Sequence, residues 1–191
     1  MPFDLDQFIA DCQQAVRDDP SHKFVREVVA RAVANPVDIL HGLGEPTQGA
    51  MIPLFRSSEL TILNVVWAPR MCLLPHNHKM WGVIGIYTGR EDNIFWRRVG
   101  DHPANIQAAG ARALSEKDAF PMGQDIIHSV INPIPRLTGA LHVYGGDFFG
   151  VERSEWDPET LCEQSSSGEK MSRRFDEANS LWKLSKAAAS S

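Results

Sequence analysis

The chain runs Leu60-Thr-Ile-Leu-Asn-Val-Val-Trp67 through the first of five short segments rich in β-branched and aromatic residues. Gly, Pro, Asn and Asp separate these segments, as they separate the strands of all-β proteins. The other four segments are Trp81-Gly-Val-Ile-Gly-Ile-Tyr87, Asn93-Ile-Phe-Trp-Arg-Arg98, Ile126-Ile-His-Ser-Val-Ile131 and Gly139-Ala-Leu-His-Val-Tyr144. Because no helical pattern lies between them, they predict a mainly β fold, an antiparallel sandwich or barrel.

Helical periodicity replaces the strand pattern at both ends of the chain. From Leu5 to about Ala34, apolar residues recur at helical intervals with a break at Asp19-Pro20-Ser21, which predicts two amphipathic helices. The composition changes again after Ser154, and a mixed-charge segment from Lys170 to Lys186 predicts a C-terminal helix. The expected apolar face of that helix consists of Met171, Phe175, Ala178, Leu181 and Trp182.

The length of 191 residues and the hydrophobic content of 43% are sufficient for one buried core. We therefore expect a single domain over residues 1–191. Its parts would be N-terminal helices at 1–45, a barrel at 50–150 and a C-terminal extension at 151–191.

Charge and cysteine content exclude several classes of protein. The net charge of −5 lacks the basic excess that steers proteins onto nucleic acid, and no apolar run approaches the length that spans a bilayer. Cys12, Cys72 and Cys162 are odd in number and far apart, which favours free thiols in a reducing compartment. The first residues are acidic where a signal peptide is basic. These features predict a cytoplasmic protein, monomeric or homodimeric, with a small-molecule partner.

The histidine pair His76 and His78 lies one residue apart, directly after Pro75. On a strand, side chains at i and i+2 point to the same face, so both imidazoles can bind one metal ion. The alternative for an isolated pair is a histidine-rich surface turn. A third histidine, His128, lies 50 residues later in another strand-like segment, and these surroundings favour a metal site over the surface turn.

These residues resemble the two sequence motifs of cupins. His-x-His at 76–78 corresponds to the first motif, and Pro121-Met-Gly123 followed by His128 and Asn132 corresponds to the second. The resemblance implies a double-stranded β-helix, or jelly-roll, barrel. The first motif usually continues with a glutamate ligand, but Gly82 and Val83 stand at those positions here. What remains is a three-histidine site, the arrangement found in the thiol dioxygenases, with Fe(II) or another divalent metal as cofactor.

A closer resemblance, over residues 54 to 149, is to the bacterial type of the cysteine dioxygenase family. Leu141-His-Val-Tyr144 is similar to a family segment whose His and Tyr lie beside the metal, which implies catalytic roles for His142 and Tyr144. Ala140 departs from the family pattern, since a serine begins this network there. The resemblance also implies Arg56 as the partner of a substrate carboxylate, and Trp81 is expected to line the pocket. No cysteine occupies the position that animal members cross-link to the tyrosine.

The implied activity is oxidation of a small carboxylate-bearing thiol, of the cysteine or 3-mercaptopropionate type, to a sulfinate with O2. Two alternatives keep the metal site. The first is a three-histidine cupin that acts on a carbon substrate, as a diketone-type dioxygenase or an isomerase. The second is a non-catalytic metal-binding cupin, which would need a closed, four-ligand site.

Overall fold

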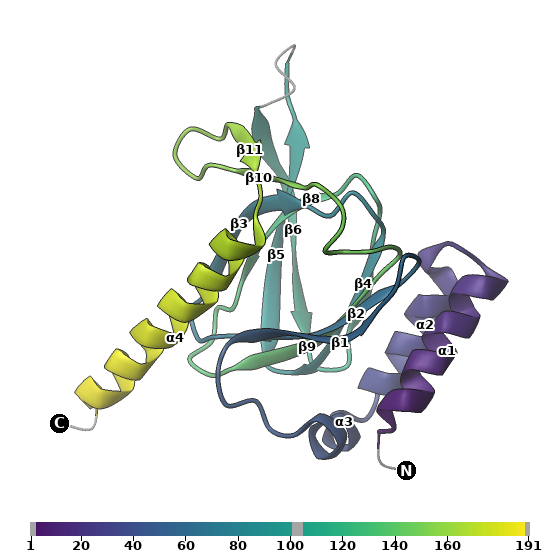
Figure 1. Cartoon of the computed structure of the whole chain (residues 1–191). Coiled ribbons are helices and arrows are strands. Elements are labelled where there is room, and N and C mark those ends of the chain that lie inside the picture. The colour runs from purple at the N-terminus through teal and green to yellow at the C-terminus, as the bar shows by residue number, and fades with distance from the viewer. Residues whose placement is uncertain (1–2, 101–104, 190–191) are drawn as a thin grey trace.

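A computed structural model describes residues 3–100 and 105–189 of the chain. Three helices come first, and a fourth closes the chain (Figure 1). The helices are α1 (Leu5–Asp18), α2 (His22–Val33), α3 (Pro36–Leu43) and α4 (Gly168–Ala189). The strands are β1 (Ala50–Arg56), β2 (Thr61–Trp67), β3 (Cys72–Asn77), β4 (Gly82–Thr88), β5 (Arg90–Arg98), β6 (Ile106–Ser115), β7 (Ala119–Met122), β8 (Ile127–Ile131), β9 (Thr138–Tyr144), β10 (Ser154–Trp156) and β11 (Glu163–Ser165).

The strands form two antiparallel sheets that face each other. One sheet has the order β1-β2-β9-β4-β7 and the other the order β11-β10-β3-β8-β5-β6. Neighbours in each sheet are often distant in sequence, as β2 and β9 are, so the chain crosses repeatedly between the sheets. This is the double-stranded β-helix barrel that the sequence predicted. All five predicted segments are strands in it, namely β2, β4, β5, β8 and β9.

Strand β9 shows how the first sheet separates two environments. Leu141 and Val143 belong to the apolar cluster beneath the N-terminal helices, whereas Ala140 and Tyr144 belong to clusters inside the barrel. Since side chains alternate along a strand, His142 also points inward, between Leu141 and Val143. Every residue of β9 is buried, because both faces of this sheet are covered.

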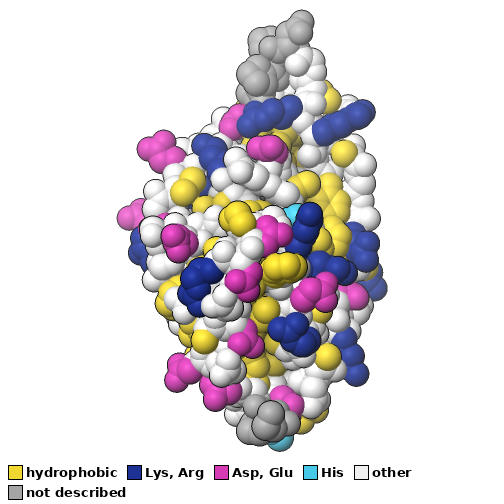
Figure 2. Space-filling model, turned by 90° about the vertical axis from the view of Figure 1, so that its right-hand side faces the viewer, with side chains coloured by type: hydrophobic (Ala, Val, Ile, Leu, Met, Phe, Trp, Pro, Cys, Tyr) yellow, Lys and Arg dark blue, Asp and Glu magenta, His cyan; other side chains and the backbone are white. Residues whose placement is uncertain are grey.

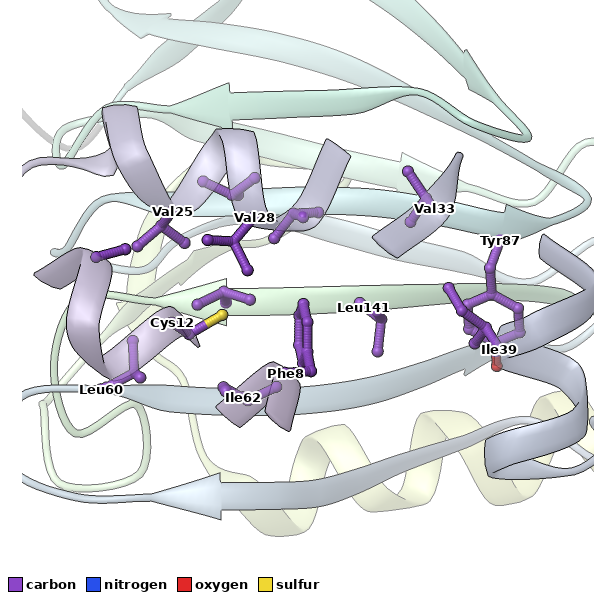
Figure 3. Close-up of a cluster of buried hydrophobic side chains, with 14 residues drawn as sticks. Phe8, Cys12, Val25, Val28, Val33, Ile39, Leu60, Ile62, Tyr87 and Leu141 are labelled. Carbon is purple, nitrogen blue, oxygen red and sulfur yellow. The ribbon is translucent and has the colours of Figure 1, made fainter. Parts of the chain in front are cut away.

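Helices α1 and α2 cover the outer face of the first sheet. Asp4 and Ser21 cap their N-termini, and Pro20 lies in the break between them, as the sequence predicted. Figure 3 shows Phe8, Cys12, Val25 and Val28 of the helices pointing toward Leu60, Ile62 and Leu141 of the sheet. Burial of each large side chain of this cluster contributes about 1.5–3 kcal/mol. This packing fixes the sheet on which the inward residues of β9 stand.

Helix α4 lies against the opposite side of the barrel (Figure 1). Phe175 is buried and stacks on Trp67 with ring centroids 5.6 Å apart, and the Asn179 amide exchanges two hydrogen bonds with the backbone of Gly49. The predicted apolar face is only partly buried. Leu181 is 68% exposed, because the C-terminal half of α4 runs beyond the edge of the barrel.

The surface carries charges of both signs. Figure 2 shows Lys and Arg side chains interspersed with Asp and Glu over the face formed by the N-terminal helices. Among the described residues, no helix combines the length and the apolar character needed to cross a membrane.

The sequence pattern did not predict several of the strands. Strand β6 is the longest strand, yet its sequence, Ile106-Gln-Ala-Ala-Gly-Ala-Arg-Ala-Leu-Ser115, has almost no strand-forming residues. It becomes a strand because it pairs with β5 along its whole length. Strands β10 and β11 have three residues each and exist through similar pairing.

We expect Gly85→Ala to destabilise the protein by about 1–3 kcal/mol, because Gly85 lies under helix α2 and an added Cβ would overlap the methyl groups of Val29 and Val33. Urea unfolding would measure the change. Gly110→Ala in β6 is the control, since an added Cβ there meets open space and should change the free energy of unfolding by no more than about 0.5 kcal/mol. Equal effects of the two substitutions would contradict the tight packing of α2 on the sheet.

Candidate metal centre

Three histidines converge inside the barrel. His76 lies on β3, His78 directly follows that strand, and His128 lies on β8, paired in register with His76. Their ring centroids are 4.5–5.0 Å apart, and one ring nitrogen of each lies within 4.8 Å of the others. All three are buried, with 6%, 4% and 1% of their surface exposed, respectively. A histidine-rich surface turn is therefore excluded.

Hydrogen bonds orient two of these rings. His76 Nδ1 donates to the carbonyl oxygen of Leu74 at 2.8 Å, and His128 Nδ1 lies 2.6 Å from Oδ1 of Asn93. A ring that donates from Nδ1 keeps a lone pair on Nε2, which is how neutral histidine commonly binds metals. Nε2 of His128 lies 3.4 Å from Nε2 of His78, so these two nitrogens face the same point.

Burial keeps the three imidazoles neutral. Desolvation lowers the pKa of His76 to about 4, although the hydrogen bond to Leu74 opposes this shift. Desolvation, reinforced by the neighbouring imidazoles, holds the pKa values of His78 and His128 well below the ordinary value. The cluster thus offers three neutral nitrogen donors at neutral pH, which fits a divalent transition metal ion. Within residues 3–100 and 105–189, this is the only group of three potential ligands that close together.

His142 and Tyr144 lie beside the cluster, as the family resemblance implied. The Tyr144 hydroxyl is 2.9 Å from Nδ1 of His142, and the Tyr144 ring packs against His78 at 4.7 Å between centroids. Burial raises the pKa of Tyr144 far above its ordinary value, so its hydroxyl keeps its proton. The pair therefore places a neutral hydroxyl next to a potential metal ligand.

Two polar residues that the sequence analysis did not single out lie behind the histidines. Glu91 and Asn93, both on β5, are completely buried in the barrel. Glu91 accepts hydrogen bonds from Trp67 Nε1 at 2.7 Å and from the Asn93 amide at 3.0 Å. The sequence offered one indication of this pair: Glu91 and Asn93 are two residues apart at the start of a strand, so both side chains lie on the same face. Only the pairing of β5 with β8 shows that this face is inside.

Arg153 was also missed, although it is the arginine beside the histidines. It lies in the loop after β9, where its guanidinium stacks on Phe148 at 3.8 Å, and Phe148 in turn packs on Tyr144 and His78. Burial lowers the pKa of Arg153, and no carboxylate among the described residues lies within salt-bridge distance of it. No pattern in the sequence distinguishes Arg153 from the surface arginines.

A cavity of about 490 Å³ leads to Arg153 from the surface, between helix α4 and strand β1. Phe149 and Arg153 line it on the barrel side, and Met171, Asn179 and Lys183 line it on the helix side. The three histidines are not among the residues that line this cavity, and the ring contacts Arg153–Phe148–His78 lie between its wall and them. The C-terminal extension therefore forms one wall of a cavity that Arg153 also lines.

The structure argues against the role expected of Arg56. Its guanidinium makes a bidentate ion pair with Asp147 at 2.7 and 2.9 Å, and its side chain is 52% exposed. A paired, exposed guanidinium attracts a further carboxylate weakly, because solvent and the existing partner screen its charge. Arg153 differs from Arg56 in that it is half-buried and has no carboxylate partner among the described residues.

The expectation that Trp81 lines the pocket is corrected as well. Its indole nitrogen donates to the carbonyl oxygen of Pro20 at 2.9 Å, and its ring packs with the apolar cluster under the N-terminal helices. Trp81 precedes β4 and faces the outside of the first sheet, whereas the histidines lie inside the barrel.

No protein-family model matches the chain. Among solved structures, it is similar to an RmlC-like cupin family protein with a double-stranded β-helix fold from Methanocaldococcus jannaschii, with 10% identity over 55% of this chain and 85% of that one and a TM-score of 0.45. It is also similar to the DMSP lyase DddQ from Ruegeria pomeroyi, with 17% identity over 56% and 50% of the two chains and a TM-score of 0.43. A third is the Bacillus subtilis oxalate decarboxylase, an enzyme with Mn(II) centres, with 18% identity over 48% and 22% and a TM-score of 0.38.

We expect His76→Ala, His78→Ala and His128→Ala each to lose bound divalent metal, because each removes one of three donors from the cluster. Metal content after gel filtration, by elemental analysis, would measure the loss. His41→Ala is the control, since His41 is exposed on α3 and should leave the metal content unchanged. Metal retention in two of the three cluster variants would contradict the site.

The free energy of unfolding of the metal-free protein should fall as the pH drops from about 6.5 to about 4. Unfolded imidazoles take up protons near pH 6.5, whereas His76 does so only near pH 4 in the folded protein, so acid favours the unfolded chain. Each such histidine contributes a slope of up to about 1.4 kcal/mol per pH unit.

Urea titrations at several pH values would measure this dependence. His76→Gln should make the slope shallower, and His41→Gln, at an exposed position, should keep the wild-type slope. An unchanged slope in His76→Gln would contradict a neutral, buried His76.

Proposed function

We propose that the protein is a non-haem iron dioxygenase that oxidises a small carboxylate-bearing thiol to its sulfinate. The balanced reaction is R–SH + O2 → R–SO2⁻ + H⁺, in which both oxygen atoms go to sulfur. The observation that carries the proposal is a combination of three features among the described residues: a three-histidine cluster with no carboxylate ligand, a neutral tyrosine against it, and a half-buried arginine without a carboxylate partner.

His76, His78 and His128 would hold the metal. Bound Fe(II) would supply the one-electron chemistry that lets triplet O2 react with a closed-shell thiolate. Three neutral ligands leave the charge of a divalent ion uncompensated, which favours the ionised form of a thiol beside it. Since no fourth ligand joins the cluster among the described residues, a metal held there would keep coordination positions open to substrate.

Tyr144 would hold a proton beside the reacting sulfur and oxygen atoms. Because burial raises the pKa of its hydroxyl, Tyr144 acts as a hydrogen-bond donor and not as a base. His142 positions that hydroxyl through the 2.9 Å contact with its Nδ1. The surrounding side chains Leu63, Met80 and Phe148 are buried and apolar, so they exclude bulk water and strengthen these polar contacts.

Arg153 would bind the carboxylate of the substrate. Its guanidinium offers two parallel N–H donors to a carboxylate, and its stacking on Phe148 leaves the edge of the guanidinium available. Substrate would enter through the cavity between α4 and β1 with its carboxylate stopping at Arg153. The thiol end would then point past Phe148 toward the histidines.

Oxygen consumption by the iron-loaded protein tests the proposal. We expect consumption with 3-mercaptopropionate or cysteine and formation of one sulfinate per O2, measured by mass spectrometry. Pentane-2,4-dione is the comparison substrate, because a three-histidine cupin acting on carbon would consume O2 with the diketone and not with the thiols. An iron-loaded protein that oxidises none of the thiols would overturn the proposal, and metal binding without any turnover would favour the non-catalytic cupin.

We expect Arg153→Met to raise KM for a carboxylate-bearing thiol by about 30-fold or more, equivalent to about 2 kcal/mol for a buried charge pair. Cysteamine, which lacks a carboxylate, should show little change. Arg56→Met is the matched control and should leave both values of KM unchanged, because Arg56 is already paired with Asp147. A larger effect in Arg56→Met than in Arg153→Met would restore the assignment made from the sequence.

A further inference from the structure

We propose that Glu91 is a positioning residue. It determines which ring nitrogen carries the hydrogen in the metal ligand His128 and in His142, the partner of Tyr144. It does so by accepting a hydrogen bond from Asn93 and by attracting the N–H group of His142 across 3.5 Å, and each of these residues leads to a functional side chain. The proposal concerns the metal site alone and does not depend on which substrate the protein oxidises.

Glu91 lies where three polar side chains meet inside the barrel. Its side chain is completely buried, on the inward face of β5. Oε2 accepts from Trp67 Nε1 at 2.7 Å and lies 3.5 Å from Nε2 of His142, and Oε1 accepts from the Asn93 amide at 3.0 Å. An ionised carboxylate only accepts hydrogen bonds, so all three neighbours must present N–H groups to it.

The first arm runs through Asn93 to the metal ligand His128. Because Asn93 uses its NH2 group to donate to Glu91, its carbonyl oxygen is the atom that faces His128. That oxygen lies 2.6 Å from Nδ1 of His128 and can only accept, so Nδ1 must carry the hydrogen. Nε2 of His128 is then unprotonated, as a metal ligand requires.

The second arm runs through His142 to Tyr144. Nε2 of His142 is the one buried side-chain N or O atom without a hydrogen-bond partner in the part of the chain that the structure describes. The carboxylate oxygen of Glu91, 3.5 Å away, attracts a hydrogen on that nitrogen. Nδ1 of a neutral His142 then carries a lone pair, which accepts the Tyr144 hydroxyl hydrogen across 2.9 Å.

Only an ionised carboxylate satisfies this arrangement. A glutamine at position 91 would have a single acceptor oxygen and an NH2 group. At least one of the three neighbouring N–H groups would then point at the NH2 group, where two donors meet and no hydrogen bond can form. Reversing Asn93 would relieve that conflict but would turn the Asn93 NH2 toward Nδ1 of His128. Burial alone would raise the pKa of Glu91, but the interactions with His142, Asn93 and Trp67 outweigh it and hold that pKa below its ordinary value, in keeping with a charged acceptor.

The first test is the protonation pattern of the imidazoles in the wild-type, metal-free protein. Long-range ¹H–¹⁵N NMR distinguishes protonated from unprotonated ring nitrogens, and His128→Gln and His142→Gln identify the signals. We expect hydrogen on Nδ1 of His128 and on Nε2 of His142. Hydrogen on the other nitrogen of either ring, in a neutral imidazole, would overturn the proposal, whether or not any variant of Glu91 folds.

The second test is Zn²⁺ affinity, measured by competition with a chromogenic chelator. Loss of a residue that orients metal ligands typically costs about 10- to 100-fold in affinity, so we expect a loss in that range for Glu91→Gln. The protonation pattern of His128 or His142 should change in the same variant.

Glu155→Gln is the matched control for buried carboxylates. Glu155 is 4% exposed and pairs with Lys170 and Arg174 of helix α4, outside the Glu91 network. Its substitution should keep both the Zn²⁺ affinity and the protonation pattern, even if the protein loses stability. Wild-type affinity and an unchanged pattern in a folded Glu91→Gln protein would overturn the proposal.

Discussion

The strict two-residue alternation of side chains along β9 and its neighbours is the constraint on which the rest of the structure depends. The sheet β1-β2-β9-β4-β7 is covered by helices on one face and encloses the site with the other. Leu141 and Val143 anchor β9 to α1 and α2, and this anchoring fixes His142 and Tyr144 on the opposite face. A shift of one residue in register would exchange the two faces of β9. His142 and Tyr144 would then lie under the helices, and Leu141 and Val143 would point into the barrel.

The polar interior of the barrel imposes a second constraint, because each buried polar group needs a hydrogen-bond partner. Trp67, Glu91, Asn93 and His128 satisfy one another in a continuous series that ends at the histidine cluster. This series of hydrogen bonds orients the ring nitrogens of His128 in the metal-free protein. Preorganisation of this kind lowers the cost of binding, because the rings need not reorient.

The barrel alone does not complete the site. Arg153 comes from the segment after β9, and the wall of the cavity beside it comes from α4. The hydrogen bonds between Asn179 and Gly49 and the stacking of Phe175 on Trp67 hold that helix to the barrel. The C-terminal extension thus contacts, through Phe175, the same aromatic side chain, Trp67, that donates to Glu91.

The sequence by itself determined the mainly β core and the flanking helices, because these depend on local periodicity, and its cupin-like motifs implied the jelly-roll barrel and the three histidines. His76 and His78 share a strand face through their separation of two, and so do His142 and Tyr144. The tertiary structure alone decided which polar and charged residues meet the histidines. Glu91 and Asn93 on β5 and Arg153 after β9 lie far along the chain from His76 and His78. Trp81 lies outside the barrel, and Arg56 is paired with Asp147, because burial and charge pairing depend on contacts between residues far apart in the sequence. Strand β6 follows the same rule, since only its pairing with β5 overrides a composition that disfavours strands.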